Sequence, residues 1–249
     1  GRISMSEAKN LIDQYYEAKQ GRISVDDRTE EADKVSARIA EILAEQTFSF
    51  SPVEYIAIHR RLFHGIYKFA GKIRDYNITK KEWVLQGDTV LYASAGNIRE
   101  TLEYDFEQEK NFSYKGLNVD ESIKHIAKFI SGVWQIHAFG EGNTRTTAVF
   151  AIKYLRTFGF HFNNDAFASH SWFFRNALVR ANYNNISKEV YATTEYLEQF
   201  LRKLILEEPI ELQNRTMLIG EEILCAPQSA IETGKEVSKC KICTLDCTL

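Results

Sequence analysis

Prolines are rare in this sequence, and their rarity constrains the fold more than any other feature. Three occur, at positions 52, 209 and 227. The long segments between them carry apolar residues at intervals of three and four, which is the period of an α-helix with one buried face. Because a proline inside such a helix would break it, these segments are free to stay helical. The sequence therefore predicts an all-α fold.

The clearest predicted helix begins at Pro52. Ser51 suits its N-cap, and Glu54, three residues later, completes a capping box. Gly71 predicts its C-terminal end, and Asp120 predicts the cap of a later helix. Further helices are expected at residues 6–20, 27–46, 97–110, 120–136, 144–159, 166–182 and 187–206. Residues expected to lie in the core include Trp172, Phe173 and Phe174.

One segment departs from the helical pattern. Gln86-Gly87-Asp88 lies between short runs rich in Val, Leu, Trp and Tyr, as the turn of a β-hairpin does. We therefore predict a small β-hairpin flap within residues 76–95.

The composition excludes some classes of protein. The chain has 249 residues, 44% of them hydrophobic, and a formal net charge of -3. Such a chain has no basic field for a nucleic-acid backbone, so we expect no nucleic-acid partner. It has no run of 18 apolar residues and no charged-then-apolar leader, so we expect no membrane span and a cytoplasmic location.

Three regions follow from this pattern: an N-terminal helical arm at 5–49, a core at 50–206 and a C-terminal tail at 207–249. All four cysteines lie in the tail, at 225, 240, 243 and 247. No disulfide framework can therefore cross the core. Cys240 and Cys243 have the spacing of a metal knuckle, but without a nearby His or a second such pair a disordered tail is favoured.

The sequence HAFGEGNTRTTAVF, residues 137–150, predicts a loop between two helices with a binding site in it. The head of the second helix has unpaired N–H groups that suit a phosphate. Gly142 lets the backbone approach such a ligand closely, Asn143 adds an amide donor, and Arg145 adds a guanidinium fork.

Two further residues of this loop suggest chemistry. Glu141 beside a bound polyphosphate calls for a cation between them, and Mg2+ is the usual one. His137 titrates near neutrality and is a candidate general base for an attacking hydroxyl. A lone His at a helix end is more often structural, so the case for His137 as a base depends on its combination with the other residues of this loop.

That combination resembles the signature of Fic (Fido-domain) proteins, His-x-Phe-x-Asp/Glu-Gly-Asn-Gly-Arg-x-x-Arg. Six of its eight specified places match, at His137, Phe139, Glu141, Gly142, Asn143 and Arg145. The resemblance also covers FAGKIRDYNITKK, which leads into the predicted hairpin, and it extends over about residues 50–206.

The resemblance implies an all-helical Fic/Fido core with a β-hairpin flap, and transfer of AMP from ATP to a hydroxyl of a target protein. By it, His137 is the base, Glu141 holds Mg2+ and Phe139 is a core anchor. The implied nucleotide-binding residues are Gly140, Gly142, Asn143, Thr144 and Arg145, and the weaker candidates are Lys80, Asn182 and Tyr183. The flap residues that would dock the protein substrate are Trp83, Val84, Leu85, Val90 and Tyr92.

Two departures leave alternatives open. Thr144 stands where the signature has its second Gly, and Ala148 where it has its second Arg. The related Doc proteins also lack that Arg and transfer the γ-phosphate, so a Doc-like protein kinase is one alternative. A catalytically degenerate Fic domain that only binds is another. We favour AMP transfer, because Gly142 leaves the phosphate seat open.

Many proteins of this family also carry an inhibitory helix with the pattern Ser/Thr-x-x-x-Glu-Gly/Asn, whose Glu competes for the second Arg. Neither end of the chain contains the pattern. We therefore expect a separate antitoxin or inhibitor, or no inhibition of this type.

Overall fold

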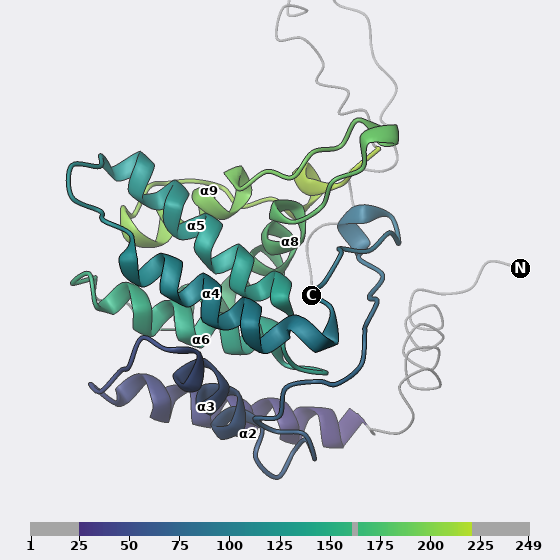
Figure 1. Ribbon diagram of the computed structural model, residues 1–249, viewed down its shortest axis with the longest axis vertical. Coiled ribbons are helices and arrows are strands. Elements are labelled where there is room, and N and C mark those ends of the chain that lie inside the picture. Colours follow the sequence, from purple (N-terminus) through teal and green to yellow (C-terminus); the bar gives the residue numbers. More distant parts are fainter. Residues whose placement is uncertain (1–24, 161–163, 221–249) are drawn as a thin grey trace, which may run out of the picture. The chain divides into compact units, whose positions relative to one another are not determined.

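The structure is a computed structural model that describes residues 25–160 and 164–220, and it is mostly helical (Figure 1). The α-helices are α2 (Val25–Ala44), α3 (Pro52–Phe63), α4 (Ile98–Asn111), α5 (Val119–Ile136), α6 (Asn143–Arg156), α7 (Asp165–Ser169), α8 (Ser171–Ala181) and α9 (Glu195–Ile205). Short 3-10 helices are η1 (Trp83–Leu85), η2 (Ala95–Asn97), η3 (Ile186–Lys188) and η4 (Asn214–Met217). The prediction of an all-α fold is confirmed.

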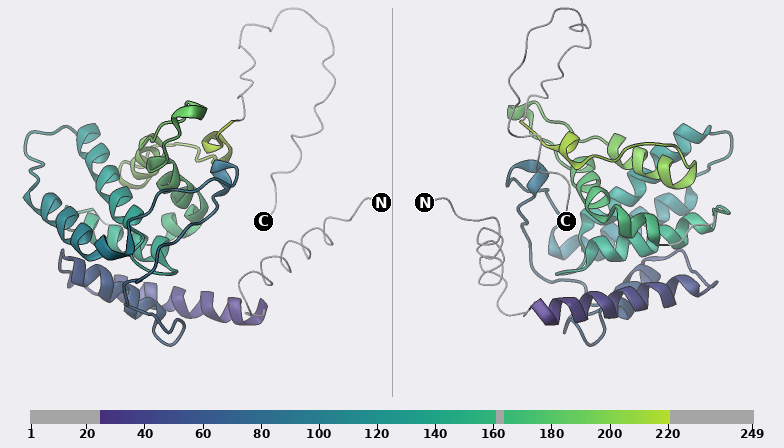
Figure 2. Two further views of the ribbon diagram at one scale, coloured as in Figure 1. Left: turned by 45° about the vertical axis from the view of Figure 1, so that its right-hand side comes forward. Right: turned by 180° about the vertical axis from the view of Figure 1, so that it is seen from behind.

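The core lies around α5 and α6. Helix α5 contacts α4, α6, α8 and α9, whereas α2 and α3 pack on α6 and lie side by side (Figures 1 and 2). The most deeply buried side chains are aromatic, among them Trp134, Phe139 and Phe150. They pack the C-terminal half of α5 and the loop after it against α6, so the predicted functional loop lies on the core itself.

The start of α3 is confirmed and its end is not. Ser51 Oγ accepts a hydrogen bond from the N–H of Glu54 at 3.1 Å, and Pro52 is the first helical residue. The helix ends at Phe63, because His64 leaves helical geometry with ψ of 129°. Gly71, the predicted end, instead belongs to the turns that follow.

The cap of α5 also differs from the prediction. Asn118 Oδ1 accepts from the N–H of Glu121 and Glu121 Oε2 accepts from the N–H of Asn118, both at 2.9 Å. This is a complete capping box two residues earlier than expected. Asp120 instead pairs with Arg202 of α9.

The last predicted helices are shorter than expected. Residues 166–182 are divided at His170 into α7 and α8. Helix α9 begins at Glu195 rather than at 187, because Glu189 takes a left-handed conformation with φ of 54° and ends η3. Trp172, expected in the core, is 48% exposed.

The predicted β-hairpin is not found within residues 76–95. The N–H groups of Leu85 and Gly87 both donate to Glu82 O, at 3.2 and 2.9 Å, which closes a tight turn over η1. Val84 and Leu85 are neighbours and both are fully buried, whereas a strand sends successive side chains to opposite faces. Among the described residues, the isolated bridge between Asn185 and Val190 is the one β-type pairing outside helices.

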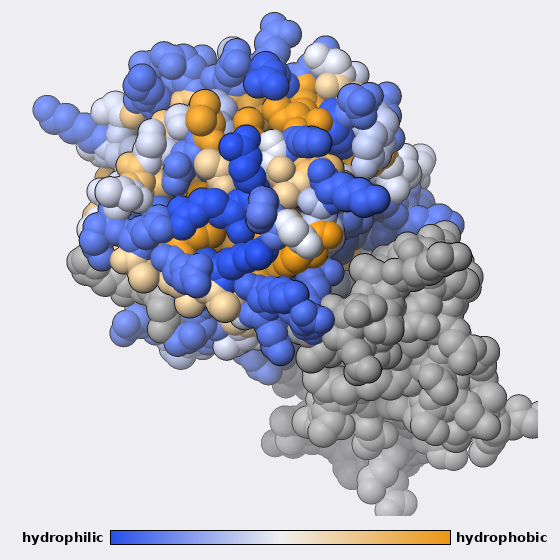
Figure 3. All heavy atoms as spheres, turned by 90° about the horizontal axis from the view of Figure 1, so that it is seen from below, coloured by the Kyte–Doolittle hydropathy of each residue, from blue (hydrophilic) through white to orange (hydrophobic). Residues whose placement is uncertain are grey.

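The remaining sequence-based expectations concern the ends and the surface. The predicted helix at 6–20 and all four cysteines lie outside the described residues, and the division into arm, core and tail stays a prediction. None of the described helices combines the length and the apolar character that a bilayer crossing requires. On the face drawn in Figure 3, hydrophilic side chains predominate among the described residues, with hydrophobic groups between them.

Candidate functional site

The turn at His137 ends α5 and is held from outside by Arg74. His137 has φ of 51°, a left-handed conformation that is uncommon for a residue other than glycine. The Nε of Arg74 donates to His137 O at 2.7 Å, and its other nitrogens donate to the carbonyls of Tyr76, Ala93 and Ile136. One buried guanidinium thus fixes the strained turn. Sequence reasoning missed Arg74, although it lies in the conspicuous stretch FAGKIRDYNITKK.

The imidazole of His137 is buried and has no hydrogen-bond partner among the described residues. It is 3% exposed, and both ring nitrogens are unpartnered. Tyr92 packs against it at 4.2 Å between ring centroids. Burial, with help from the charge of Lys80, lowers the pKa of His137 well below its usual value. The ring is therefore neutral at physiological pH and able to accept a proton.

His59 of α3 positions the loop between α5 and α6. Its Nδ1 accepts from the N–H of Gly71 at 2.8 Å, so Nε2 carries the proton and donates to Glu141 O at 3.0 Å. The ring also stacks on Phe139 at 3.7 Å. Burial lowers the pKa of His59 to about 4, so this neutral tautomer persists. Nothing in the sequence around His59 marked it as part of the site.

Asn143 closes the same loop. Its Oδ1 accepts from the N–H of Phe139 at 3.0 Å, and its Nδ2 donates to Phe139 O at 2.8 Å. The amide was predicted to add a donor for a ligand, but it is 3% exposed and engaged within the loop. Phe139 is fully buried, as expected of a core anchor.

The two glycines of the loop have different roles from those expected. Gly142 has φ of 82°, and a Cβ there would lie 2.4 Å from Cε2 of Phe63. Its lack of a side chain thus serves the fold of the loop as well as the approach of a ligand. A Cβ at Gly140 would lie 2.6 Å from the hydroxyl of Tyr76, and Gly140 does not line the cavity described below.

The N-terminus of α6 is open for an anion. The first α6 bond from this end runs from the N–H of Thr146 to Gly142 O, at 3.0 Å. The N–H groups of residues 143–145 have no acceptor within the described part of the chain. Thr144 Oγ1 accepts from Trp134 Nε1 at 3.0 Å, which fixes the hydroxyl beside these donors. Unpaired N–H groups and the helix dipole together favour a bound phosphate.

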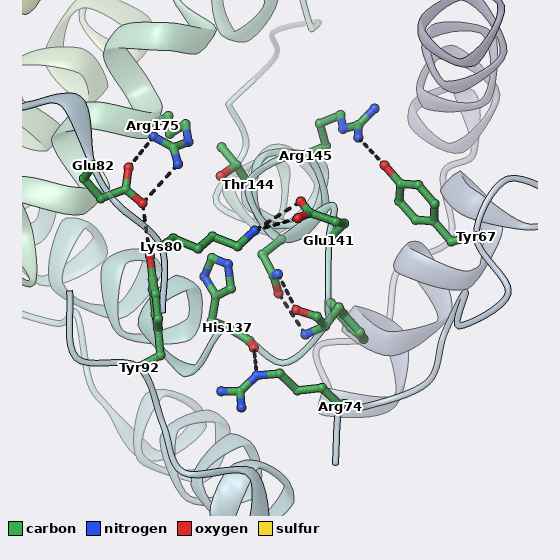
Figure 4. Close-up of polar contacts among 12 residues, drawn as sticks. Tyr67, Arg74, Lys80, Glu82, Tyr92, His137, Glu141, Thr144, Arg145 and Arg175 are labelled. Atoms are coloured by element: carbon green, nitrogen blue, oxygen red, sulfur yellow. Dashed lines mark hydrogen bonds and ion pairs between the residues drawn. The ribbon is translucent and has the colours of Figure 1, made fainter. Parts of the chain in front are cut away.

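A cavity of about 300 Å³ joins these features (Figure 4). Its lining comprises Lys80, His137, Glu141, Gly142, Asn143, Thr144, Arg145, Ser171, Trp172 and Arg175. The structure thus brings together seven of the ten residues predicted for catalysis, nucleotide binding and the metal. Sequence reasoning missed the three from α8, because they lie far along the chain and match no part of the loop motif.

Lys80 and Glu141 form an ion pair across the cavity. Lys80 Nζ lies 3.1 Å from each carboxylate oxygen of Glu141 (Figure 4). The Glu141 side chain is 58% exposed, so the pair can open at little cost. No cluster of three or more metal-ligating His, Cys, Asp or Glu side chains occurs in the described ranges. Glu141 alone does not make a metal site. It would fit Mg2+ only with phosphate oxygens completing the coordination, and the cation beside it in the structure is the ammonium of Lys80.

Arg145 points away from His137 and toward α2. Its Nη1 and Nη2 lie 3.2 and 3.1 Å from Glu31 Oε1. Nη2 also donates to the hydroxyl of Tyr67 at 3.0 Å (Figure 4). The guanidinium also lies 4.7 Å over the ring of Phe63. The sequence search for an inhibitory Glu found none, yet Glu31 holds the one motif arginine that the chain retains.

The other predicted residues lie elsewhere. Asn182 donates to the carbonyls of Ser131 and Leu178 and lines a different cavity. Tyr183 donates to Asp88 at 2.5 Å behind η1. Of the predicted docking residues, Trp83 is 47% exposed, whereas the buried ones are Val84, Leu85, Val90 and Tyr92.

The buried histidines predict how the protein titrates. Each is neutral in the fold and takes up a proton near pH 6.5 once unfolded. Their contribution to the free energy of unfolding is therefore fully present above pH 6.5, and the free energy of unfolding should fall as the pH drops below that value. For His59, this fall in the free energy of unfolding should end near pH 4. NMR titration of the imidazole protons, assigned with His59→Gln and His137→Ala, checks this; midpoints near 6.5 in the folded protein would contradict it.

Comparison with known proteins finds similarity to one family. Residues 49–155 match the model of the Fic/DOC family. The chain is similar to protein adenylyltransferase VbhT of Bartonella schoenbuchensis, with 25% identity over 179 residues. This match covers 72% of the chain and 34% of the relative, so the chain spans about a third of that relative's length.

Solved structures show the same fold. The N-terminal Fic domain of an effector protein from Bartonella sp. AR 15-3 matches with a TM-score of 0.57 and 18% identity, over 75% of this chain and 85% of that one. BepC of Bartonella tribocorum, solved with bound AMPPNP, matches with a TM-score of 0.52 and 18% identity, over 71% of this chain and 86% of that one.

Proposed function

This chain carries a Fic/DOC-family domain at residues 49–155, and from that premise we propose that it transfers AMP from ATP to a hydroxyl side chain of a target protein. The observation that carries the proposal is the neutral, unpartnered ring of His137, which lines one cavity with the open N-terminus of α6. A base beside an anion seat is the arrangement that attack of a hydroxyl on a phosphate requires. The name of the relative VbhT, a protein adenylyltransferase, points to the same reaction.

The proposed reaction uses the residues of the cavity in turn. His137 accepts the proton of the target hydroxyl, whose oxygen attacks the α-phosphorus of ATP. The bond from that phosphorus to the pyrophosphate oxygen breaks, and pyrophosphate leaves. The N–H groups at the head of α6 stabilise the negative charge on the phosphate under attack. Glu141 would hold Mg2+, which would supply charge neutralisation for the polyphosphate.

Incubation of the protein with α-labelled and γ-labelled ATP in separate samples, together with a cell lysate, tests the proposal. Label from the α position, with a mass gain of one AMP on the target, is the expected result. Label from the γ position alone, with a gain of one phosphate, would instead establish the Doc-like kinase, which Ala148 favours. Binding of ATP without label on any protein would favour the degenerate binding domain.

Glu141→Gln is expected to abolish the Mg2+ dependence of ATP binding. The amide keeps the size of the side chain but loses the charge that a hard cation requires. Binding titrations of ATP with and without Mg2+ measure the effect, and the parent should need Mg2+ for both binding and transfer. Full transfer in EDTA by the parent protein would contradict this role of the metal.

The segment after η1 is the proposed docking place for the protein substrate. Val90 and Tyr92 are buried whereas Leu91 is 84% exposed, which is the alternation of an extended strand. An added strand from the target would bind through main-chain hydrogen bonds and bring its hydroxyl toward His137. A separate inhibitor protein remains part of this proposal.

A further inference from the structure

We propose that Arg175 of α8 holds the phosphates of ATP beyond the α-phosphate, in place of the guanidinium that Ala148 does not supply. The inference rests on the proposed function, because it concerns how the same cavity binds its nucleotide. It assigns to Arg175 the ability to distinguish ATP from AMP.

Arg175 lies on the opposite side of the anion seat from Arg145. Figure 4 shows the two guanidinium groups on either side of Thr144, with the Lys80–Glu141 pair between them. Both arginines line the cavity, but the guanidinium of Arg145 is turned to Glu31 and Tyr67. A polyphosphate whose α-phosphate lies at the head of α6 therefore finds a guanidinium on the α8 side.

Arg175 is fixed in position before any ligand binds. Its Nη1 and Nη2 donate to Glu82 at 2.5 and 3.0 Å. The Glu82 side chain is fully buried and also accepts from the hydroxyl of Tyr92 at 3.2 Å. The guanidinium lies 5.6 Å over the ring of Trp172. Because this anchor is bidentate and buried, it removes most of the entropy cost of ordering the arginine side chain when a phosphate binds.

The anchor leaves donors available to a ligand. A guanidinium has five N–H groups, and Glu82 takes two of them, so three have no acceptor within the described residues. The Arg175 side chain is 27% exposed. Because Glu82 is buried and pairs with both terminal nitrogens, it holds the fork in place while the remaining N–H groups bind phosphate oxygens. Lys80, by contrast, must first leave Glu141.

Arg175→Lys is the most direct test, because it keeps the charge next to Glu82 and removes the fork. Isothermal titration of the full chain with ATP, ADP and AMP measures the affinities. ATP is expected to bind about 10-fold to 100-fold more weakly than to the parent, and AMP within about twofold of the parent value. Arg61→Lys is the matched control, since Arg61 forms a similar two-bond pair with Glu45 on the surface.

A second variant separates binding from folding. Glu82→Gln combined with Arg175→Gln removes both members of the buried pair, so no uncompensated charge stays behind. It should show the same selective loss of ATP over AMP. Equal losses for ATP and AMP, or no loss for either in a folded variant, would overturn the assignment of Arg175. If the parent protein binds none of the three nucleotides, the proposed function itself fails.

Discussion

His137→Ala is expected to lower the rate of transfer by about 10²-fold to 10⁴-fold, the range that general-base catalysis contributes. The imidazole is neutral and both of its nitrogens are unpartnered among the described residues, so its removal costs the fold no hydrogen bond. ATP affinity should stay within a few-fold of the parent, because the N–H groups of residues 143–145 remain. Single-turnover kinetics with the identified target, beside ATP titrations, measures the two quantities.

His59→Gln is the matched control for that experiment. It also removes a buried imidazole, but one that positions Glu141 through its carbonyl rather than one that faces a ligand. It should weaken nucleotide binding and transfer together, whereas His137→Ala should affect transfer alone. Transfer by His137→Ala at the parental rate would show that another group accepts the proton.

Gly142→Ala is expected to destabilise the fold by about 2 to 5 kcal/mol. A residue with a Cβ costs about 1 to 2 kcal/mol in the left-handed conformation, and overpacking costs about 1 to 3 kcal/mol more. The overpacking arises because the Cβ would lie 2.4 Å from Cε2 and 2.6 Å from Cζ of Phe63. Denaturant unfolding followed by circular dichroism measures the change.

Gly116→Ala separates the two causes. Gly116 has φ of 88°, but a Cβ there would meet nothing within 4 Å, so this variant should lose only the conformational part, about 1 to 2 kcal/mol. Phe63→Leu replaces the ring that the new Cβ meets with a smaller side chain. In combination with Gly142→Ala, the two losses of stability should therefore be less than additive. Equal destabilisation by Gly142→Ala and Gly116→Ala would show that the ring of Phe63 yields freely.

The loop between α5 and α6 could be predicted from the sequence because the residues that mark it are local. His137, Glu141 and the head of α6 lie within nine residues, and the change from one helix to the next is marked by glycines. The same local patterns predicted the start of α3, since Ser51 and Pro52 suit a helix N-terminus whatever surrounds them. Helical periodicity likewise predicted an all-α fold.

The rest of the site depends on partners that are distant in the sequence. Arg175 belongs to the cavity because α8 packs against α5 and η1, and no local pattern marks those contacts. Trp172 was predicted to lie in the core because its neighbours are aromatic, but it lies on the exposed face of α8. The hairpin is not confirmed, because Val84 and Leu85 are both drawn into the core, which overrides the tendency of such residues to form strands.

Arg74 joins three stretches of chain that are far apart in sequence: its own neighbour Tyr76, Ala93 before α4, and the end of α5. The turn that presents His137 can therefore not form as a local unit during folding. It takes shape when those stretches have already met, so the base is assembled cooperatively with the domain. Amide hydrogens around the turn should accordingly exchange with solvent by global unfolding rather than by local opening.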